Sequence, residues 1–263
     1  MGRPLVSGLL RLSRAATSAL AFAMVFLPYY VRTRDLWSSI MLATPIFTIA
    51  MCMFILNDIN DVDRDRINHP RRPLPTGTIS VKTAGIAYLL LFGTSLILVR
   101  ILIERGVHFI YLAGFLLAIN YNTVVNNLPK LKNPYVALTA TVPVFIVNSA
   151  LATPAIPTSV ALAIFLFVFG REMLMDVHDA PGDGQTLAKS LTTGRAAVIA
   201  FSLQAMAMVV LGLHLTSPLR IISLGLILLL FAYILARWRR PQARLFLIHL
   251  MKVQLMVALS FLL

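Results

Sequence analysis

Long runs of apolar residues are the feature that most constrains the fold of this 263-residue chain. A helix needs about 20 such residues to cross roughly 30 Å of hydrocarbon, and no alternating strand pattern competes with these runs. Only helices and closed barrels satisfy their own backbone groups in lipid. The sequence therefore predicts an all-α membrane protein, a single domain (1–263) with a bundle of about nine transmembrane helices. The predicted spans are 15–31, 36–56, 82–103, 107–124, 134–152, 156–176, 195–215, 218–236 and 244–263.

Composition supports this class of protein. The chain is 59% hydrophobic and only 13% charged, whereas soluble domains carry about 25% charged residues. Cys52 is the one cysteine, which excludes an internal disulfide and a cysteine metal cluster. The net charge of +13 comes from short basic segments between spans and not from one binding stripe, so no nucleic-acid partner is predicted.

The basic residues also predict an orientation. Cytoplasmic segments of membrane proteins are enriched in Lys and Arg. If the N-terminus is cytoplasmic, most of the 23 basic residues fall on that side, in the N-terminal segment and the loops near 57–81, 125–133, 177–194 and 237–243. We therefore expect an integral, multi-pass protein with its N-terminus and its two longest loops, 57–81 and 177–194, forming cytoplasmic caps.

The acidic residues are concentrated in two clusters. Of ten acidic residues, four lie between Asp58 and Asp65 and four between Glu172 and Asp183. At 100° per residue, a helix continuing through the first cluster places Asn57, Asp58, Asp61 and Asp65 on one flank, with Asp63 pointing away. The second cluster has helical spacing too, in a stripe formed by Glu172, Asp176, Asp179 and Asp183, although Pro181-Gly182 must break that helix.

Two stripes of carboxylates offer oxygen ligands and no soft donors, as Mg²⁺ prefers, with Mn²⁺ as a substitute. Mg²⁺ usually keeps bonds to water and to substrate phosphate. Many cations lie near these clusters in the sequence, which favours a diphosphate held by metal and cations together. They are Arg64, Arg66, Arg71, Arg72, Lys130, Lys132, Lys189 and Arg195.

Two other interpretations compete with a metal site. Acidic residues at helix ends are often only solvated charges, but such charges are not expected to gather in two stripes on one face. An ion transporter would carry acidic residues along its conduction path, nearer the middle of broken helices. Here both clusters lie at span ends, which argues against a transporter.

The two clusters also resemble the two signatures of a known family, the UbiA superfamily of intramembrane prenyltransferases. The first reads Asn57-Asp58-x-x-Asp61-x-x-x-Asp65, followed by Arg66-Ile67-Asn68-His69-Pro70-x-Arg72-Pro73-Leu74-Pro75-x-Gly77. The second reads Arg171-Glu172-x-x-x-Asp176-x-x-Asp179-x-x-Gly182-Asp183, with Lys189-Ser190-Leu191 after it. The resemblance extends over essentially the whole chain, and its second motif looks nearest to the branch that prenylates glycerol phosphate ethers.

The resemblance implies a helical bundle whose central cavity opens to lipid and holds the diphosphate of an isoprenoid donor with two Mg²⁺ ions. The donor ionises to an allylic cation, which an aromatic or hydroxyl acceptor captures. The implied ligands of the first metal are Asn57, Asp58, Asp61 and Asp65. Asp179 and Asp183 would hold the second metal, supported by Asp176. Asp61, Asp65, Asp179 and Asp183 are thus the expected catalytic residues, and Arg72 and Lys189 the expected diphosphate contacts.

One position departs from the family pattern. Many members have a tyrosine followed four or five residues later by a lysine at the inner end of the fourth span. Tyr121 stands in place, but Val125 and Asn126 follow it. We expect Lys130 or Lys132 to supply the missing charge, with Asn57, Arg64 and Tyr121 as further substrate contacts. A terpene cyclase on the same scaffold stays open as an alternative to a prenyltransferase, because no acceptor-binding residue is evident.

Overall fold

The computed structural model describes residues 2–103, 105–123, 128, 130–179 and 187–263, which form helices and connecting loops with no β-strand among them. The all-helical prediction is confirmed for these residues. Their contacts divide the chain into two compact units: residues 1–126 with 145–153, and residues 127–144 with 154–263. They are the first unit and the second unit, respectively.

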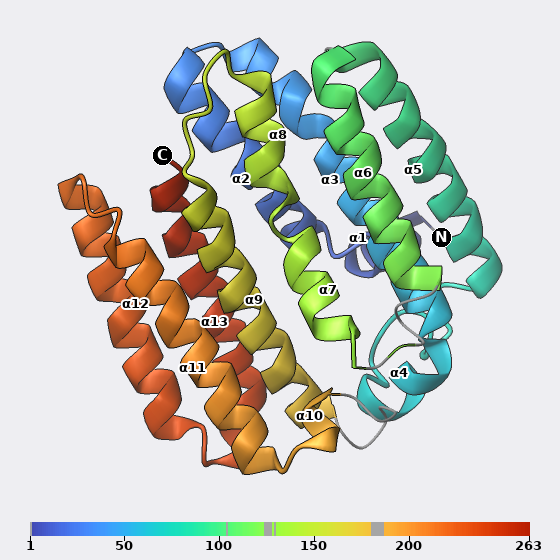
Figure 1. The fold of residues 1–263 in the computed structure, drawn as a ribbon. Helices are drawn as coiled ribbons and strands as arrows, with labels where there is room; N and C mark the ends of the chain where they lie inside the picture. Colours follow the sequence, from blue (N-terminus) through green and yellow to red (C-terminus); the bar gives the residue numbers. More distant parts are fainter. Residues whose placement is uncertain (1, 104, 124–127, 129, 180–186) are drawn as a thin grey trace. The chain divides into compact units, whose positions relative to one another are not determined.

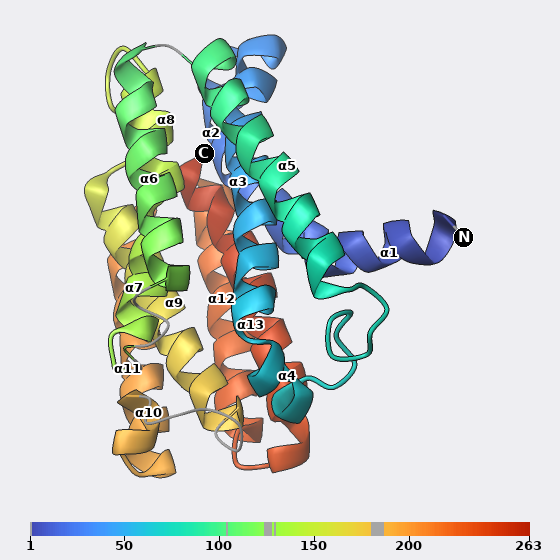
Figure 2. The ribbon, with the colours of Figure 1, turned by 90° about the vertical axis from the view of Figure 1, so that its right-hand side faces the viewer.

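The first unit is built around α3, which packs between α2 and α5 (Figure 1). A sharp turn joins α1 to α2, and α1 runs across the direction of α3 and α5 (Figure 2). The helices of this unit are α1 (Gly2–Leu12), α2 (Ala15–Thr33), α3 (Leu36–Asn60), α4 (Val62–Asn68), α5 (Val81–Leu102) and α6 (Arg105–Thr123).

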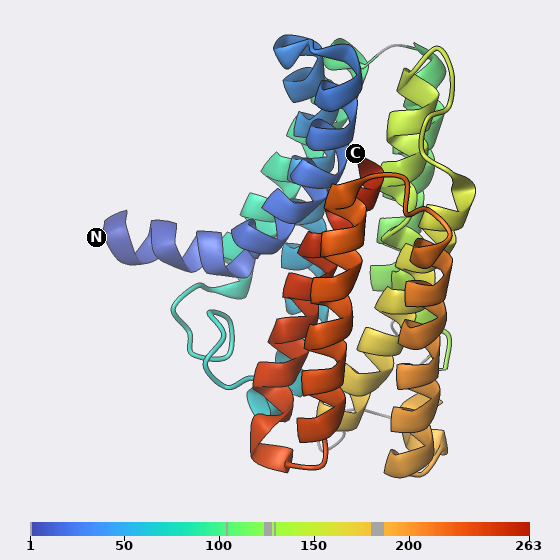
Figure 3. The same cartoon turned by 90° about the vertical axis from the view of Figure 1, so that its left-hand side faces the viewer.

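In the second unit, α9 packs closely on α11, while α12 and α13 run side by side (Figure 3). Its helices are α7 (Lys132–Thr139), α9 (Thr158–Asp179), α10 (Leu187–Ser190), α11 (Thr193–Gly212), α12 (Pro218–Arg237) and α13 (Arg244–Ala258), with short 3₁₀ turns at Pro241–Ala243 and Leu259–Leu262. Helix α8 (Val142–Ala150) begins in this unit and ends in the first.

Six helical segments of the described chain are long and apolar enough to cross a membrane. They are α2, α3, α5, α11, α12 and the segment Pro241–Leu262. Helices α6 and α9 occupy the predicted fourth and sixth runs, and α9 carries the second acidic cluster at its end. Several spans are therefore confirmed, whereas the count of nine stays a prediction.

The predicted fifth span, 134–152, is not one continuous helix. It is divided into α7, which ends at Thr139, and α8, which begins at Val142. Pro143 explains the interruption, because proline lacks the N–H that a helix interior needs and its ring clashes with the preceding turn. The apolar composition predicted the length of this run but not its division into two helices.

Polar residues set where several of the long helices begin. An oxygen on an N-cap side chain accepts a hydrogen bond from a backbone N–H that the helix leaves unpaired. Ser80, Thr192 and Ser217 do this for α5, α11 and α12, and Asp35 does so for α3 by accepting from the Ser38 N–H at 3.1 Å. Hydrogen bonds from Ser38 also lower the pKa of the Asp35 carboxyl.

Small residues allow α9 and α11 to approach closely. Gly170 of α9 lies against the backbone of α11, where a Cβ atom at position 170 would come within 2.5 Å of the Ala200 carbonyl oxygen. Ala196 and Ala200 are fully buried on the facing helix. Close packing of small side chains is a main source of helix association in lipid, where apolar burial offers little.

Candidate functional site

The first acidic cluster lies where α3 gives way to α4. Asp61 separates the two helices, yet its N–H donates to the Asn57 carbonyl at 2.9 Å and the Asp65 N–H donates to the Asp61 carbonyl at 2.8 Å. The helical spacing therefore continues through the junction. As predicted, Asp63 points away, with 86% of its side chain exposed. Asp58 and Asp65 are buried.

The loop after α4 is fixed by its apolar residues. Leu74 and Ile79 are buried in a cluster with Leu12 and Ile55. The chain reverses at Gly77, whose φ of 71° lies in the left-handed region that favours glycine. The Pro-Leu-Pro-x-Gly segment of the motif thus anchors the loop, which holds the preceding residue, Arg72, over α3 and α4.

Arg72 joins two buried carboxylates. Its Nη1 donates to both Asp65 oxygens, at 2.7 and 2.6 Å, and lies 3.4 Å from Asp58 Oδ1. Burial raises the pKa of the Asp65 carboxyl, and the Arg72 guanidinium acts against this shift. A charged guanidinium carries five N–H donors, so Arg72 is also suited to bind a diphosphate oxygen.

Arg14 is a second cation on the same cluster. Its Nη2 donates to Asp58 Oδ1 at 2.6 Å, and its guanidinium lies 4.9 Å from the centre of the Phe54 ring. Arg14 links α1 to α2 in a left-handed conformation, with a φ of 46°, which is costly for a residue with a Cβ. The contacts with Asp58 and Phe54 offset that strain.

Asp61 has partners on its own flank. Asn57 Nδ2 donates to Asp61 Oδ2 at 3.1 Å, and Arg64 Nη2 lies 2.8 Å from Asp61 Oδ1. The neighbouring Asn60 Nδ2 donates to the Asn122 carbonyl oxygen at 2.7 Å. This bond ties the end of α3 to the end of α6, which carries Tyr121.

Three residues of the second acidic cluster, Glu172, Asp176 and Asp179, lie in the last turns of α9 (Thr158–Asp179). Asp176 is buried and accepts a hydrogen bond from Asn133 Nδ2 at 2.8 Å. Lys132 Nζ lies 3.5 Å from its other oxygen. Glu172 pairs with the adjacent Arg171. Lys132, predicted to contact substrate, is thus an ion-pair partner of this cluster.

Part of the predicted site lies outside the described residues. This applies to Asp183, to the Pro181-Gly182 break, and to Val125 and Asn126 after Tyr121. Lys189 belongs to α10, but its side chain is not described. Lys130 is exposed. The predicted roles of these residues stay predictions.

Two partners of the acidic residues were not predicted as site residues. Arg14 counted only toward the basic N-terminus, although its place just before the first span was a signal that it could fold back on the motif. Asn133 gave less signal, because it is one of several Asn and Lys residues in the short polar segment 126–133 before a predicted span.

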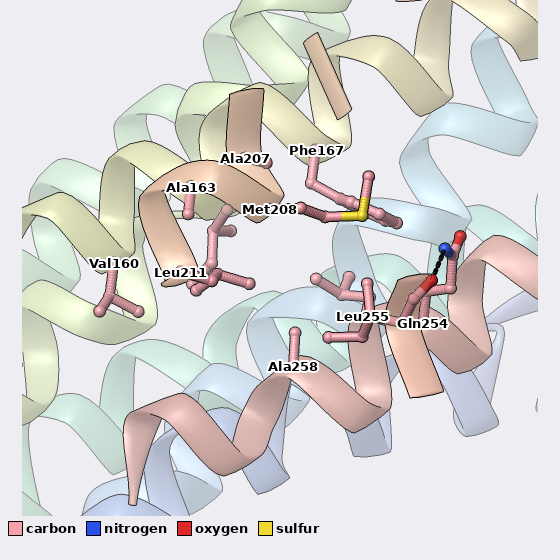
Figure 4. A pocket seen from close by; sticks show the side chains of 11 residues that line it. Val160, Ala163, Phe167, Ala207, Met208, Leu211, Gln254, Leu255 and Ala258 are labelled. Atoms are coloured by element: carbon pink, nitrogen blue, oxygen red, sulfur yellow. Dashed lines mark hydrogen bonds between the residues drawn. The ribbon is translucent and has the colours of Figure 1, made fainter. Parts of the chain in front are cut away.

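The second unit also contains a small apolar pocket between α9, α11, α12 and α13 (Figure 4). Phe167, Met208 and Leu255 line it, and Gln254 donates its Nε2 to the Ile227 carbonyl oxygen at 3.0 Å on one side. No predicted site residue lines this pocket. The predicted cavity beside the acidic clusters therefore stays a prediction.

The donor set fits Mg²⁺ in its chemistry. In the described chain, no three His, Cys, Asp or Glu side chains converge on one metal position. In the first cluster, Asp61 and Asp65 instead form ion pairs with Arg64 and Arg72. Asn57, Asp61 and Asp65 offer only oxygen atoms to a metal, and hard cations such as Mg²⁺ bind such atoms. A Mg²⁺ ion bound to these side chains would supply positive charge in place of Arg64 and Arg72.

Comparison with known proteins identifies the family. The pattern described as "UbiA prenyltransferase family" matches residues 19–251. The chain belongs to this family. Several relatives of this chain carry the name digeranylgeranylglyceryl phosphate synthase. The one from Methanoculleus marisnigri is 30% identical over 71% of this chain and 67% of its own length. The one from Pyrococcus abyssi is 36% identical, but the match spans 52% of this chain and about half (49%) of that relative.

Solved structures of UbiA homologues share the fold. A homologue from Aeropyrum pernix K1 aligns with a TM-score of 0.76 at 15% identity, over 94% of this chain and 96% of that one. A homologue from Archaeoglobus fulgidus, solved with GPP and Mg²⁺, aligns with a TM-score of 0.65 at 16% identity, over 97% and 99%. The predicted resemblance and the prenyltransferase class are confirmed, and the chain is an integral, multi-pass membrane protein.

Arg72 gives a test of the described contacts in this UbiA site. Breaking a buried ion pair by removing one partner costs about 3–5 kcal/mol. Because the Arg72 side chain is 26% exposed, water compensates in part, and we expect Arg72→Ala to lose about 2 kcal/mol of stability. Thermal unfolding in detergent measures this. Arg71→Ala, an exposed neighbour, is the matched control, and equal melting temperatures for both variants would contradict the network.

Proposed function

We propose that this protein transfers an isoprenoid group from a polyprenyl diphosphate to an acceptor within the membrane, in an Mg²⁺-dependent reaction. The observation that carries the proposal is the first cluster, where Asn57, Asp58, Asp61 and Asp65 share one flank and Arg72 lies across it. Carboxylates for a metal and a guanidinium for phosphate are what a diphosphate leaving group needs.

The chemistry requires negative charge to be absorbed as the C–O bond to diphosphate breaks. When bound, Mg²⁺ supplies Lewis-acid stabilisation of that charge. Asn57, Asp58, Asp61, Asp65, Asp179 and Asp183 are the proposed ligands, and two ions are proposed, with Mn²⁺ as a substitute. The proposed diphosphate contacts are Arg64, Arg72, Tyr121, Lys130, Lys132 and Lys189. Apolar spans exclude water, which protects the resulting allylic cation from hydrolysis.

For the acceptor we propose a hydroxyl group on a prenylated glycerol phosphate. The support is the shared name of the relatives, digeranylgeranylglyceryl phosphate synthase. The donor is proposed to be an isoprenoid diphosphate, since the Archaeoglobus fulgidus homologue was solved with GPP and Mg²⁺. The distribution of basic residues supports a cytoplasmic placement of the N-terminus and both motif loops.

A product assay tests this function. Purified protein in detergent or lipid vesicles is incubated with Mg²⁺ and isoprenoid diphosphates of several chain lengths, with and without a prenylated glycerol phosphate. We expect diphosphate release and a new ether product only when Mg²⁺ and acceptor are both present. Diphosphate release without acceptor, together with a cyclic hydrocarbon or alcohol, would indicate a terpene cyclase in place of a prenyltransferase. Absence of turnover with every donor would contradict both.

A further inference from the structure

Two residues of α7 contact the buried carboxylate of Asp176 in the second cluster. Asp176 is 2% exposed. Asn133 Nδ2 donates to one of its oxygens at 2.8 Å, and Lys132 Nζ approaches the other at 3.5 Å. Lys132 and Asn133, consecutive residues at the start of α7, therefore contact both oxygens of Asp176, about one turn before the end of α9.

The chemistry of Asn133 shows why an amide is placed there. Asn133 is fully buried, and its Oδ1 has no hydrogen-bond partner among the described residues. Burying an unpaired polar atom costs about 1–3 kcal/mol, so an apolar residue would be favoured unless the amide N–H₂ had a task. An ionised carboxylate only accepts hydrogen bonds, and Nδ2 supplies the donor that Asp176 needs.

Asp176 also lies at the point where α9 must be held in place. Asp179, a proposed metal ligand, is the last residue of the helix. Position 176 precedes it by three residues, close to one helical turn. A hold on Asp176 therefore fixes the direction in which the end of α9 presents Asp179.

We propose that Asp176 is a positioning residue, held by Asn133 and Lys132 so that α9 presents Asp179 correctly, and is not itself a metal ligand. This inference rests on the proposed function, because it assigns a role within the same site. Under this proposal Asp176 joins α9 to α7, and Asp179 at the end of α9 binds the metal.

Exchanging Asn133 and Asp176 tests the proposal, because the two roles of Asp176 predict opposite changes in turnover when Asp176→Asn is added to Asn133→Asp. Asn133→Asp alone places two carboxylates at hydrogen-bond distance in a buried site, which is strongly unfavourable. Adding Asp176→Asn removes one charge and restores an amide–carboxylate pair with its direction reversed. We expect the double variant to recover most of the melting temperature and turnover that Asn133→Asp loses, with an unchanged Mg²⁺ requirement.

A metal-ligand role predicts the opposite. If Asp176 binds Mg²⁺, adding Asp176→Asn to Asn133→Asp must lower turnover further and raise the Mg²⁺ concentration for half-maximal activity. Asp179→Asn, the same substitution at a proposed ligand, serves as the reference for that behaviour. Either result for the double variant, a further loss or a raised Mg²⁺ requirement, would overturn the proposal.

Thermal unfolding in detergent without Mg²⁺ gives a readout that does not depend on activity. The expected order of melting temperature is wild type, then the double variant, then Asn133→Asp. An unchanged melting temperature in Asn133→Asp would show that residues 133 and 176 are not in contact, which overturns the proposal. If wild-type protein shows no turnover with any donor, the proposed function fails, while the melting series still tests the contact.

Discussion

Asp61→Asn is expected to lower turnover by at least about 100-fold, in line with the loss of one precisely placed charge-stabilising group in an enzyme site. The substitution keeps the shape of the side chain and removes one negative charge. Asp61 lies at the α3–α4 junction, between Asn57 and Arg64, where a proposed Mg²⁺ ligand would lose its charge. Product formation at saturating donor and a range of Mg²⁺ concentrations measures the effect.

Asp63→Asn is the matched control, since it makes the same change two residues away. The Asp63 side chain is 86% exposed and pairs with Arg66 on the surface, and exposed pairs contribute only about 0–1 kcal/mol. We expect turnover within about twofold of wild type. If Asp61→Asn also stays in that range, or if both variants lose activity equally, the assignment of the flank is wrong.

The first cluster could be predicted from sequence because it follows the period of one helix. Asn57, Asp61 and Asp65 follow each other at intervals of four, Asp58 precedes Asp61 by three, and the backbone hydrogen bonds continue across Asp61. The period also placed Asp63 outside the cluster. Local spacing was sufficient here because neighbours along a helix are neighbours in space.

Contacts between distant segments could not be predicted in this way. Arg14 reaches Asp58 across 44 positions, and Asn133 reaches Asp176 across 43. Nothing in a helical period encodes such pairs, because they depend on how separate helices pack. The interrupted fifth run shows a related limit, since hydropathy measures apolar length and does not register that Pro143 prevents one continuous helix.

Gly170→Ala is expected to destabilise the second unit, because there is no free space for the added methyl group. The added Cβ meets the Ala200 carbonyl oxygen at 2.5 Å and Gln204 Cγ at 3.0 Å. A backbone carbonyl cannot move aside like a side-chain end, so α9 and α11 must separate. Overpacking of a buried contact costs about 1–3 kcal/mol, and we expect the upper end of that range, seen as a lower melting temperature in detergent.

Activity should fall with stability in this variant, because Gly170 lies immediately before Arg171 and Glu172 on the helix that ends at Asp179. A shift of α9 therefore displaces the second acidic cluster. Gly225→Ala on α12 is the matched control, since nothing lies within 4 Å of its added Cβ, and alanine favours a helix by up to about 1 kcal/mol over glycine. Equal melting temperatures for the two variants would show that α9 and α11 do not approach as closely as Gly170 indicates.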